Sequence, residues 1–226
     1  MSNSISKETR ALVRILDHHG IGAVLDVGAN VGQYATRLRQ GGWAGRIVSF
    51  EPLPEAHATL EKAAASDTQW EVAPRMALGA SGGTVSLNVS AESDMSSSLP
   101  FLPEMADLLD SAAYTGTVTA PMARLDDVFG TYAGNTERVL LKIDTQGTEA
   151  AVLEGASGIL DRIYGIQLEL SIVPVYLGER TYLDMIAALD KLGFHPALFI
   201  PGYFNHRSAR LISMDGIFIR NGVSFT

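Results

Sequence analysis

Apolar runs of strand length alternate along the chain with segments whose apolar residues recur every three or four positions. The strand-like runs cover residues 23–27, 46–51, 70–74, 138–144 and 165–170. Helical patterns follow at 31–40, 54–66, 148–156 and 181–193. This alternation is typical of a parallel sheet with helices on both of its faces. We therefore expect a doubly wound α/β fold.

Three regions depart from the alternation. Residues 82–90 and 117–125 alternate polar and apolar positions with a period of two, which predicts two additional strands. The link between them, residues 91–116, is rich in Ser and Met and has no strong period, so we expect a lid there. Two apolar runs at 194–204 and 209–220 end the chain, and they predict an antiparallel hairpin at the sheet edge.

Composition restricts the class of protein. The 226 residues are 46% hydrophobic and 19% charged, which fits an N-terminal helical arm at 1–20 and a single domain at 21–226. A formal net charge of −8 disfavours nucleic acid as a partner, because phosphate binding needs basic surface. The absence of cysteine excludes disulfides and thiolate nucleophiles. No run of 18 apolar residues occurs, so we expect no membrane partner and a cytoplasmic protein.

The first strand ends in an acid and a glycine loop, in the stretch VLDVGANVGQY at 24–34. Glycine permits positive φ and a close approach to the backbone, so Gly28 and Gly32 suit a tight turn around a bound molecule. The spacing matches neither the dinucleotide fingerprint G-x-G-x-x-G nor a phosphate-binding loop with Gly-Lys-Ser/Thr. A nicotinamide dehydrogenase is therefore disfavoured.

A second acid, Glu51, ends the second strand, 25 positions after Asp26 (51 − 26). A carboxylate at this place can accept hydrogen bonds from both hydroxyls of a ribose. Asp26 and the glycine loop would then face a positively charged group, and S-adenosylmethionine has both a ribose and a cationic tail. Each feature alone is also typical of a simple turn or a helix cap, but their conjunction at strand ends favours a nucleoside site.

Five segments carry a family resemblance. VLDVGANVGQYA, IVSFEPLPEA, LLKIDTQGTEAAVLEGA, IQLELSIVPVY and MDGIFIR occur in this order over about residues 20–220. Together they resemble the FkbM-type family of S-adenosylmethionine-dependent methyltransferases. The resemblance implies a class I, Rossmann-like, seven-stranded and mostly parallel sheet with an antiparallel C-terminal strand. It also implies S-adenosylmethionine as cofactor and methyl transfer to a hydroxyl of a sugar or natural product.

The resemblance also assigns roles to particular residues. It implies that the cofactor loop contains Asp26, Gly28, Asn30 and Gly32, followed by Tyr34, and that Glu51 binds the ribose. Met76 and Ala77 would line the adenine, and a serine-rich segment, Ser96, Ser97 and Ser98, would lie close to the cofactor.

Methyl transfer to a hydroxyl needs alignment of the acceptor oxygen and a base nearby. Asp144, at the end of the fourth strand, is our candidate base, and Glu169, near the end of the fifth, is a second catalytic candidate. The two acids could share a divalent cation, but no dense Asp/His cluster accompanies them and a metal is not favoured. The same segment offers Gln146 and Glu149, and the first-turn position of Glu149 favours a helix N-terminal carboxylate.

Our leading interpretation is an O-methyltransferase whose partner is a small-molecule acceptor with a hydroxyl group, with a homo-oligomer left open. The alternative is a non-catalytic nucleoside-binding or scaffold protein on the same fold. Asp144, retained at the sheet edge, argues against that alternative.

Overall fold

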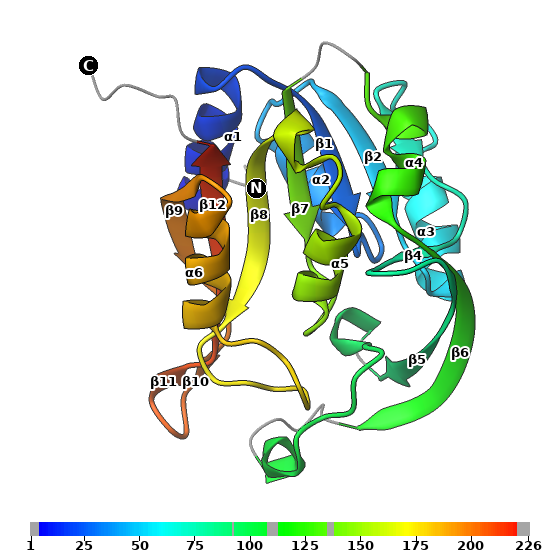
Figure 1. Ribbon diagram of the computed structural model, residues 1–226, viewed down its shortest axis with the longest axis vertical. Coiled ribbons are helices and arrows are strands. Elements are labelled where there is room, and N and C mark those ends of the chain that lie inside the picture. The colour runs from blue at the N-terminus through cyan, green and yellow to red at the C-terminus, as the bar shows by residue number, and fades with distance from the viewer. Residues whose placement is uncertain (1–4, 92, 108–112, 135–137, 221–226) are drawn as a thin grey trace.

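The computed structural model describes residues 5–91, 93–107, 113–134 and 138–220. Within these ranges a seven-stranded sheet has the order β3–β2–β1–β7–β8–β12–β9 (Figure 1). Its strands are β1 (Ile21–Val27), β2 (Arg46–Phe50), β3 (Trp70–Val72), β7 (Arg138–Ile143), β8 (Ile163–Ser171), β9 (Phe194–Pro201) and β12 (Ser213–Arg220). The first five strands in this order are parallel, and β12 is antiparallel to both β8 and β9. The mostly parallel sheet with an antiparallel C-terminal strand is confirmed.

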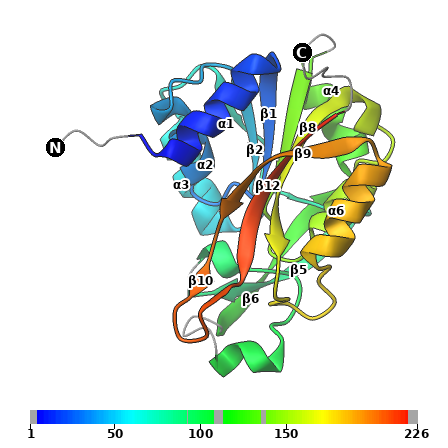
Figure 2. The same cartoon turned by 90° about the vertical axis from the view of Figure 1, so that its left-hand side faces the viewer.

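Helices cover both faces of this sheet. The helices are α1 (Lys7–His18), α2 (Gln33–Gln40), α3 (Pro54–Ala64), α4 (Leu125–Tyr132), α5 (Glu149–Gly155) and α6 (Tyr182–Lys191). Figure 2 shows α1, α2 and α3 on one side of the sheet and α4 and α6 on the other. The fold is therefore doubly wound, as the sequence predicts.

The sheet lies between two hydrophobic clusters, one on each of its faces. On β1 and β7, Leu25 and Leu141 join the cluster under α4 to α6, whereas Val24 and Leu140 join the cluster under α1 to α3. Successive strand residues point to opposite faces, and both faces are covered here, so both sets are fully buried. This is why the central strands are apolar at consecutive positions.

The C-terminal runs pair with each other as antiparallel strands and form the last two strands of the sheet, so the predicted hairpin at the sheet edge is confirmed. β12 is inserted between β8 and β9, so β9 alone forms the edge. Burial gives the reason: Ile217 and Phe218 of β12 are fully buried, whereas Phe199 of β9 is 41% exposed. A short hairpin, β10 (Phe204–Asn205) and β11 (Arg210–Leu211), connects the two strands.

A second sheet lies beyond the carboxyl ends of the central strands (Figure 1). It has the order β4–β6–β5, with β4 (Ala77–Leu78), β5 (Gly83–Ser90) and β6 (Tyr114–Ala123). β5 and β6 are antiparallel and confirm the two additional strands that the period of two predicts. Between them lie two 3₁₀ helices, η1 (Ser93–Met95) and η2 (Pro103–Asp107), and a third, η3 (Leu160–Arg162), precedes β8.

The helix α1 begins after Ser6, whose side chain accepts a hydrogen bond from the backbone N–H of Thr9. Its Leu12 and Leu16 are buried in the cluster that contains Val24. The expected division into an arm at 1–20 and a domain at 21–226, with a lid at 91–116, stays a prediction. Residues 1–4, 92, 108–112, 135–137 and 221–226 of those ranges lie outside the described residues.

The described helices include none that is both long and apolar enough to span a bilayer.

Candidate active site

The turn after β1 is held close to the loop after β7. Gly28 has φ +74°, and a Cβ placed on it would lie 1.9 Å from the carbonyl oxygen of Asp144. Gly32, with φ +88°, is restricted from the other side, because an added Cβ would lie 2.7 Å from the Trp70 ring. Both glycines are therefore required by backbone conformation and by packing.

Glu51 orders this turn from β2. Its Oε2 accepts a hydrogen bond from the backbone N–H of Asn30 at 2.7 Å, and its Oε1 accepts one from Leu53 at 2.8 Å. The residue is 3% exposed, and burial raises the pKa of its carboxyl. Because a carboxylate oxygen accepts two hydrogen bonds, each oxygen keeps one site for a ligand.

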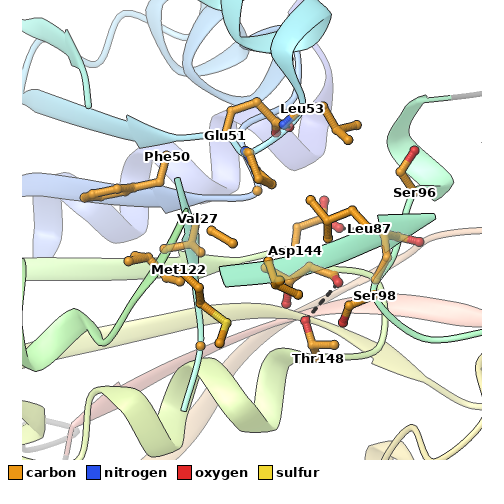
Figure 3. A pocket seen from close by; sticks show the side chains of 18 of the residues that line it. Val27, Phe50, Glu51, Leu53, Leu87, Ser96, Ser98, Met122, Asp144 and Thr148 are labelled. Carbon is orange, nitrogen blue, oxygen red and sulfur yellow. Dashed lines mark hydrogen bonds between the residues drawn. The ribbon is translucent and has the colours of Figure 1, made fainter. Parts of the chain in front are cut away.

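A cavity of about 300 Å³ lies at this turn, where the strand order reverses between β1 and β7. Eight of the predicted site residues line this cavity: Gly28, Asn30, Glu51, Met76, Ala77, Ser96, Ser98 and Asp144. Figure 3 shows Glu51, Asp144 and Thr148 around it, with Ser96 and Ser98 on the serine-rich segment. Phe50, Leu53, Leu87 and Met122 add apolar surface. An apolar cavity with a few polar groups is the usual form of a small-molecule site.

Four predicted cofactor-binding residues are not among the described residues that line this cavity: Asp26, Gly32, Tyr34 and Ser97. Asp26 is fully buried beneath the turn, and Tyr34 donates its hydroxyl hydrogen bond to Gln167 Oε1 at 2.8 Å. Ser97 donates to the carbonyl oxygen of Gln146 at 2.6 Å and ties the serine-rich segment to the loop after β7. Their contacts support the walls of the cavity from behind.

Lys142 is the positively charged group that Asp26 faces in the structure. Its Nζ lies 3.0 Å from Asp26 Oδ1 and 3.6 Å from Asp144 Oδ2, and it donates to the carbonyl oxygen of Gly28 at 3.1 Å. Burial alone would lower the pKa of Lys142, but the carboxylates of Asp26 and Asp144 raise it to about 12. Sequence reasoning missed this residue, although a lysine inside the apolar run VLLKI is a signal.

A second cavity of about 750 Å³ adjoins the first. The two share Gln33, Asp94, Asp144 and Gln146 as lining residues. Carboxylates of Glu169, Glu179 and Asp215 also line the second cavity, and its described lining contains no Lys, Arg or His. Asp144, whose side chain is 41% exposed, therefore stands at the boundary between two spaces.

The two candidate catalytic acids are brought together through Gln146. Its Nε2 donates to Asp144 Oδ1 at 2.8 Å and to Glu169 Oε2 at 3.0 Å. Burial and the nearby charge of Asp144 raise the pKa of Glu169 to about 8, so that Glu169 is largely protonated at pH 7.

Asp215 is a further acid at this edge that sequence reasoning missed. It lies directly opposite Glu169 in the register of β12 and β8. Burial, and then the charge of Asp144, raise the pKa of Asp215. Like charges opposite one another destabilise a sheet, so this pair at a cavity wall is a signal of function.

Glu149 accepts hydrogen bonds from the backbone of the loop that precedes α5. Its Oε1 accepts hydrogen bonds from the backbone N–H groups of Thr145 at 2.8 Å and Gly147 at 3.3 Å. Burial raises its pKa to about 7. These contacts agree with the interpretation of Glu149 as a carboxylate that orders a helix N-terminus.

Within the described ranges, no group of three or more His, Cys, Asp or Glu side chains is arranged to hold a metal ion.

Solved structures identify the class of fold. Magnesium protoporphyrin IX methyltransferase from Synechocystis, with bound S-adenosylmethionine, is 12% identical with a TM-score of 0.51, over 95% of this chain and 77% of that chain. Fibrillarin from Aeropyrum pernix, with S-adenosylmethionine natively bound, is 11% identical with a TM-score of 0.50, over 94% and 74%. An rRNA methylase from Streptococcus thermophilus is 11% identical with a TM-score of 0.50, over 97% and 98%. The fold is that of a class I, Rossmann-like methyltransferase.

The family follows from the sequence match. A model of the methyltransferase FkbM domain matches residues 26–196, which is most of the chain. The chain belongs to the FkbM methyltransferase family, as the resemblance in the sequence implies. No curated protein matches it by sequence.

Proposed function

We propose that this protein is an S-adenosylmethionine-dependent O-methyltransferase that methylates a hydroxyl group of a sugar or natural-product small molecule. One observation carries the proposal. A cavity of about 300 Å³ at the glycine turn adjoins a larger one of about 750 Å³, and Asp144 lines both. Cofactor and acceptor can thus meet at a carboxylate.

The smaller cavity fits the cofactor. When bound, S-adenosylmethionine supplies a methyl group on a sulfonium. The free acceptor sites on Glu51 suit the ribose hydroxyls, and Met76 and Ala77 offer contacts to the adenine. At Gly28 the backbone can approach the loop after β7 closely, because there is no Cβ to collide with it. Four further predicted residues would support the cofactor site indirectly, by holding the surrounding loops: Asp26, Gly32, Tyr34 and Ser97. The bound S-adenosylmethionine in two structural neighbours supports this assignment.

Asp144 is the base in this proposal. Its carboxylate lies at the boundary of the two cavities, 3.6 Å from the Nζ of Lys142. When the sulfonium of a bound cofactor methylates an acceptor hydroxyl, Asp144 would take the proton that the hydroxyl loses. Glu169, protonated at neutral pH, is suited to donate a hydrogen bond to the acceptor. A bound divalent cation is not part of this proposal.

The acidic lining of the larger cavity restricts the acceptor. With Asp144, Glu179 and Asp215 in its wall and no Lys, Arg or His in its described lining, an anionic molecule would be repelled at close range. An uncharged or amine-bearing acceptor fits better than a phosphorylated one. The rRNA methylase among the neighbours therefore does not suggest an RNA substrate for this chain, whose net charge is −8.

Two measurements test the proposal. Calorimetric titration should show binding of S-adenosylhomocysteine and no binding of NAD. Transfer of a labelled methyl group should then occur to members of a panel of hydroxylated small molecules, with each neutral sugar preferred over its own phosphate ester. Cofactor binding without transfer to any member would favour the non-catalytic nucleoside-binding alternative, and preferred binding of NAD would reject the cofactor.

A further inference from the structure

We propose that Gln146 is a positioning residue, which holds the carboxylates of Asp144 and Glu169 in fixed relation to each other and is itself oriented by Tyr176. The role in catalysis rests on the proposed function, because it is Asp144 that would touch the acceptor. Gln146 lies in the turn between β7 and α5 and lines both cavities.

The side-chain amide has all of its hydrogens engaged. Nε2 carries two, and it lies 2.8 Å from Asp144 Oδ1 and 3.0 Å from Glu169 Oε2. One hydrogen is thus available for each carboxylate. An amide donates without adding charge, so it can lie between two acids that would otherwise repel each other. Gln146 therefore acts through its neighbours.

Tyr176 fixes which way the amide points. The Tyr176 hydroxyl has one hydrogen and two acceptors in reach, Gln146 Oε1 at 2.8 Å and the Met95 carbonyl oxygen at 3.1 Å, and the shorter contact is the one to Gln146. The ring is 2% exposed. The flipped amide would place its carbonyl oxygen against the Asp144 carboxylate, which has no hydrogen to donate, and only a protonated Glu169 could donate to it. The orientation with Nε2 toward the acids is the one that gives both of them a donor.

The backbone at this position is also specialised. Gln146 has φ +54°, in the left-handed region that non-glycine residues rarely adopt, and Gly147 follows with φ +94°. Ser97 donates its hydroxyl hydrogen bond to the Gln146 carbonyl oxygen at 2.6 Å and holds the turn. A strained conformation persists where the surroundings enforce it, and such positions gather at functional sites.

Without this amide, Asp144 would lose a constraint. Its side chain is 41% exposed, and the remaining contact to a charged group is Lys142 at 3.6 Å. Glu169 would lose an N–H donor while it still faces Asp144, Glu149 and Asp215 and keeps its bond to Ser213. The two acids would then lose their fixed spacing.

The test uses the Glu169 carboxyl as a reporter, so it needs no acceptor. Carbon-13 NMR titration follows the pKa of Glu169 in the wild type and in Gln146→Leu, Tyr176→Phe and the double variant, each with and without S-adenosylhomocysteine. We expect Gln146→Leu to raise the pKa of Glu169, because an N–H donor to its charged form is lost. Tyr176→Phe should raise it less, and the double variant should match Gln146→Leu, because Tyr176 acts only through the amide.

Gln33→Leu is the matched control. Gln33 lines both cavities and is exposed, so the variant makes the same chemical change at the same boundary away from the contacts of Gln146. It should leave the pKa of Glu169 at the wild-type value. An unchanged pKa in Gln146→Leu, or additive effects of the two single variants, overturns the inference. Absence of S-adenosylhomocysteine binding to the wild type would reject the proposed function instead, while the titrations without ligand still decide the role of Gln146.

Discussion

Gly28 and Asp144 approach so closely that no side chain fits between them: a Cβ on Gly28 would lie 1.9 Å from the Asp144 carbonyl oxygen. Their strands are neighbours in the sheet, and the Asp144 N–H donates to the carbonyl oxygen of Val27 at 3.0 Å. The glycine turn after β1 and the loop after β7 are therefore one packed unit. A substitution in either loop should therefore alter the conformation of both.

The first prediction concerns Gly28→Ala. Its methyl group must push the two loops apart, and its positive φ adds strain, so we expect a loss of about 3 kcal/mol or more in the free energy of unfolding. Urea denaturation measures this loss, and titration with S-adenosylhomocysteine should show weakened binding. Gly20→Ala is the control, because Gly20 also has positive φ but has no atom within 4 Å of an added Cβ. Equal losses in the two variants would contradict the packing argument.

The second prediction concerns Glu51→Gln, which keeps the shape of the side chain and removes its charge. The Gln side chain has one oxygen and one N–H₂ group, so its N–H₂ would face the backbone N–H of either Asn30 or Leu53, donor against donor. The position that the N–H₂ group takes can also no longer accept a hydrogen bond from a ribose hydroxyl. Charge-assisted hydrogen bonds contribute about 1.5–3 kcal/mol, so affinity for S-adenosylmethionine should fall about tenfold or more. Glu55→Gln, on the exposed first turn of α3, should bind normally. Unchanged affinity in folded Glu51→Gln would remove the ribose role.

The sequence predicted the elements well because burial dictates their composition. Strands with two covered faces must be apolar at consecutive positions, as at Val24 and Leu25, and that pattern is visible without a structure. The order of the last two strands in the sheet could not be predicted from the sequence, because both strands are apolar. Only packing in three dimensions decides that β12 rather than β9 is the inner strand.

The site was predicted in part, and the reason is again physical. An acid at a strand end needs a partner, and the sequence indicated a positive group for Asp26. It could not distinguish a ligand from Lys142, a residue distant along the chain that the parallel pairing of β1 and β7 places beside it. Asp215 was missed for the same reason, since only strand register places it opposite Glu169.

The third prediction concerns the proposed lid at 91–116. Within its described part, Ser93, Asp94, Ser96 and Ser98 line the smaller cavity, and Ser97 is bonded to Gln146. A ligand in that cavity should gain contacts with this segment and slow its opening, so protease should cut it more slowly when S-adenosylhomocysteine is bound. Limited proteolysis with mass spectrometry locates the cuts, with NAD as control ligand. Equal cleavage under all conditions would contradict a lid.

The fourth prediction concerns stability and pH. The pKa of Glu169 is about 8 in the folded protein, against an ordinary value of 4.5, so the folded state binds a proton over this interval that the unfolded state releases. The stabilisation is present in full below about pH 4.5 and is lost as the pH rises through 8. We expect the free energy of unfolding of the ligand-free protein to decline across this range. Glu169→Gln should make the decline less steep, and urea denaturation at several pH values would show it. A parallel decline in both proteins would refute the raised pKa.

The last prediction is that Asp144→Asn lowers methyl transfer by about 10²–10⁴-fold, the usual contribution of a positioned base. The amide keeps the shape but cannot take the proton. The fold should survive, because Lys142 keeps its pair with the fully buried Asp26 at 3.0 Å. Single-turnover methyl transfer measures the rate, and S-adenosylhomocysteine affinity should stay within about threefold, because one hydrogen bond at most is altered.

Asp127→Asn is the matched control for this measurement. Asp127 is exposed in the first turn of α4 and is not among the lining residues of either cavity, so the same chemical change should leave the rate close to that of the wild type. A chelator separates a base from a metal ligand. If Asp144 held a cation, chelation would silence the wild type and added magnesium or manganese would partly restore the variant. Wild-type rates in Asp144→Asn would exclude both roles and leave the alignment of acceptor and cofactor as the source of catalysis.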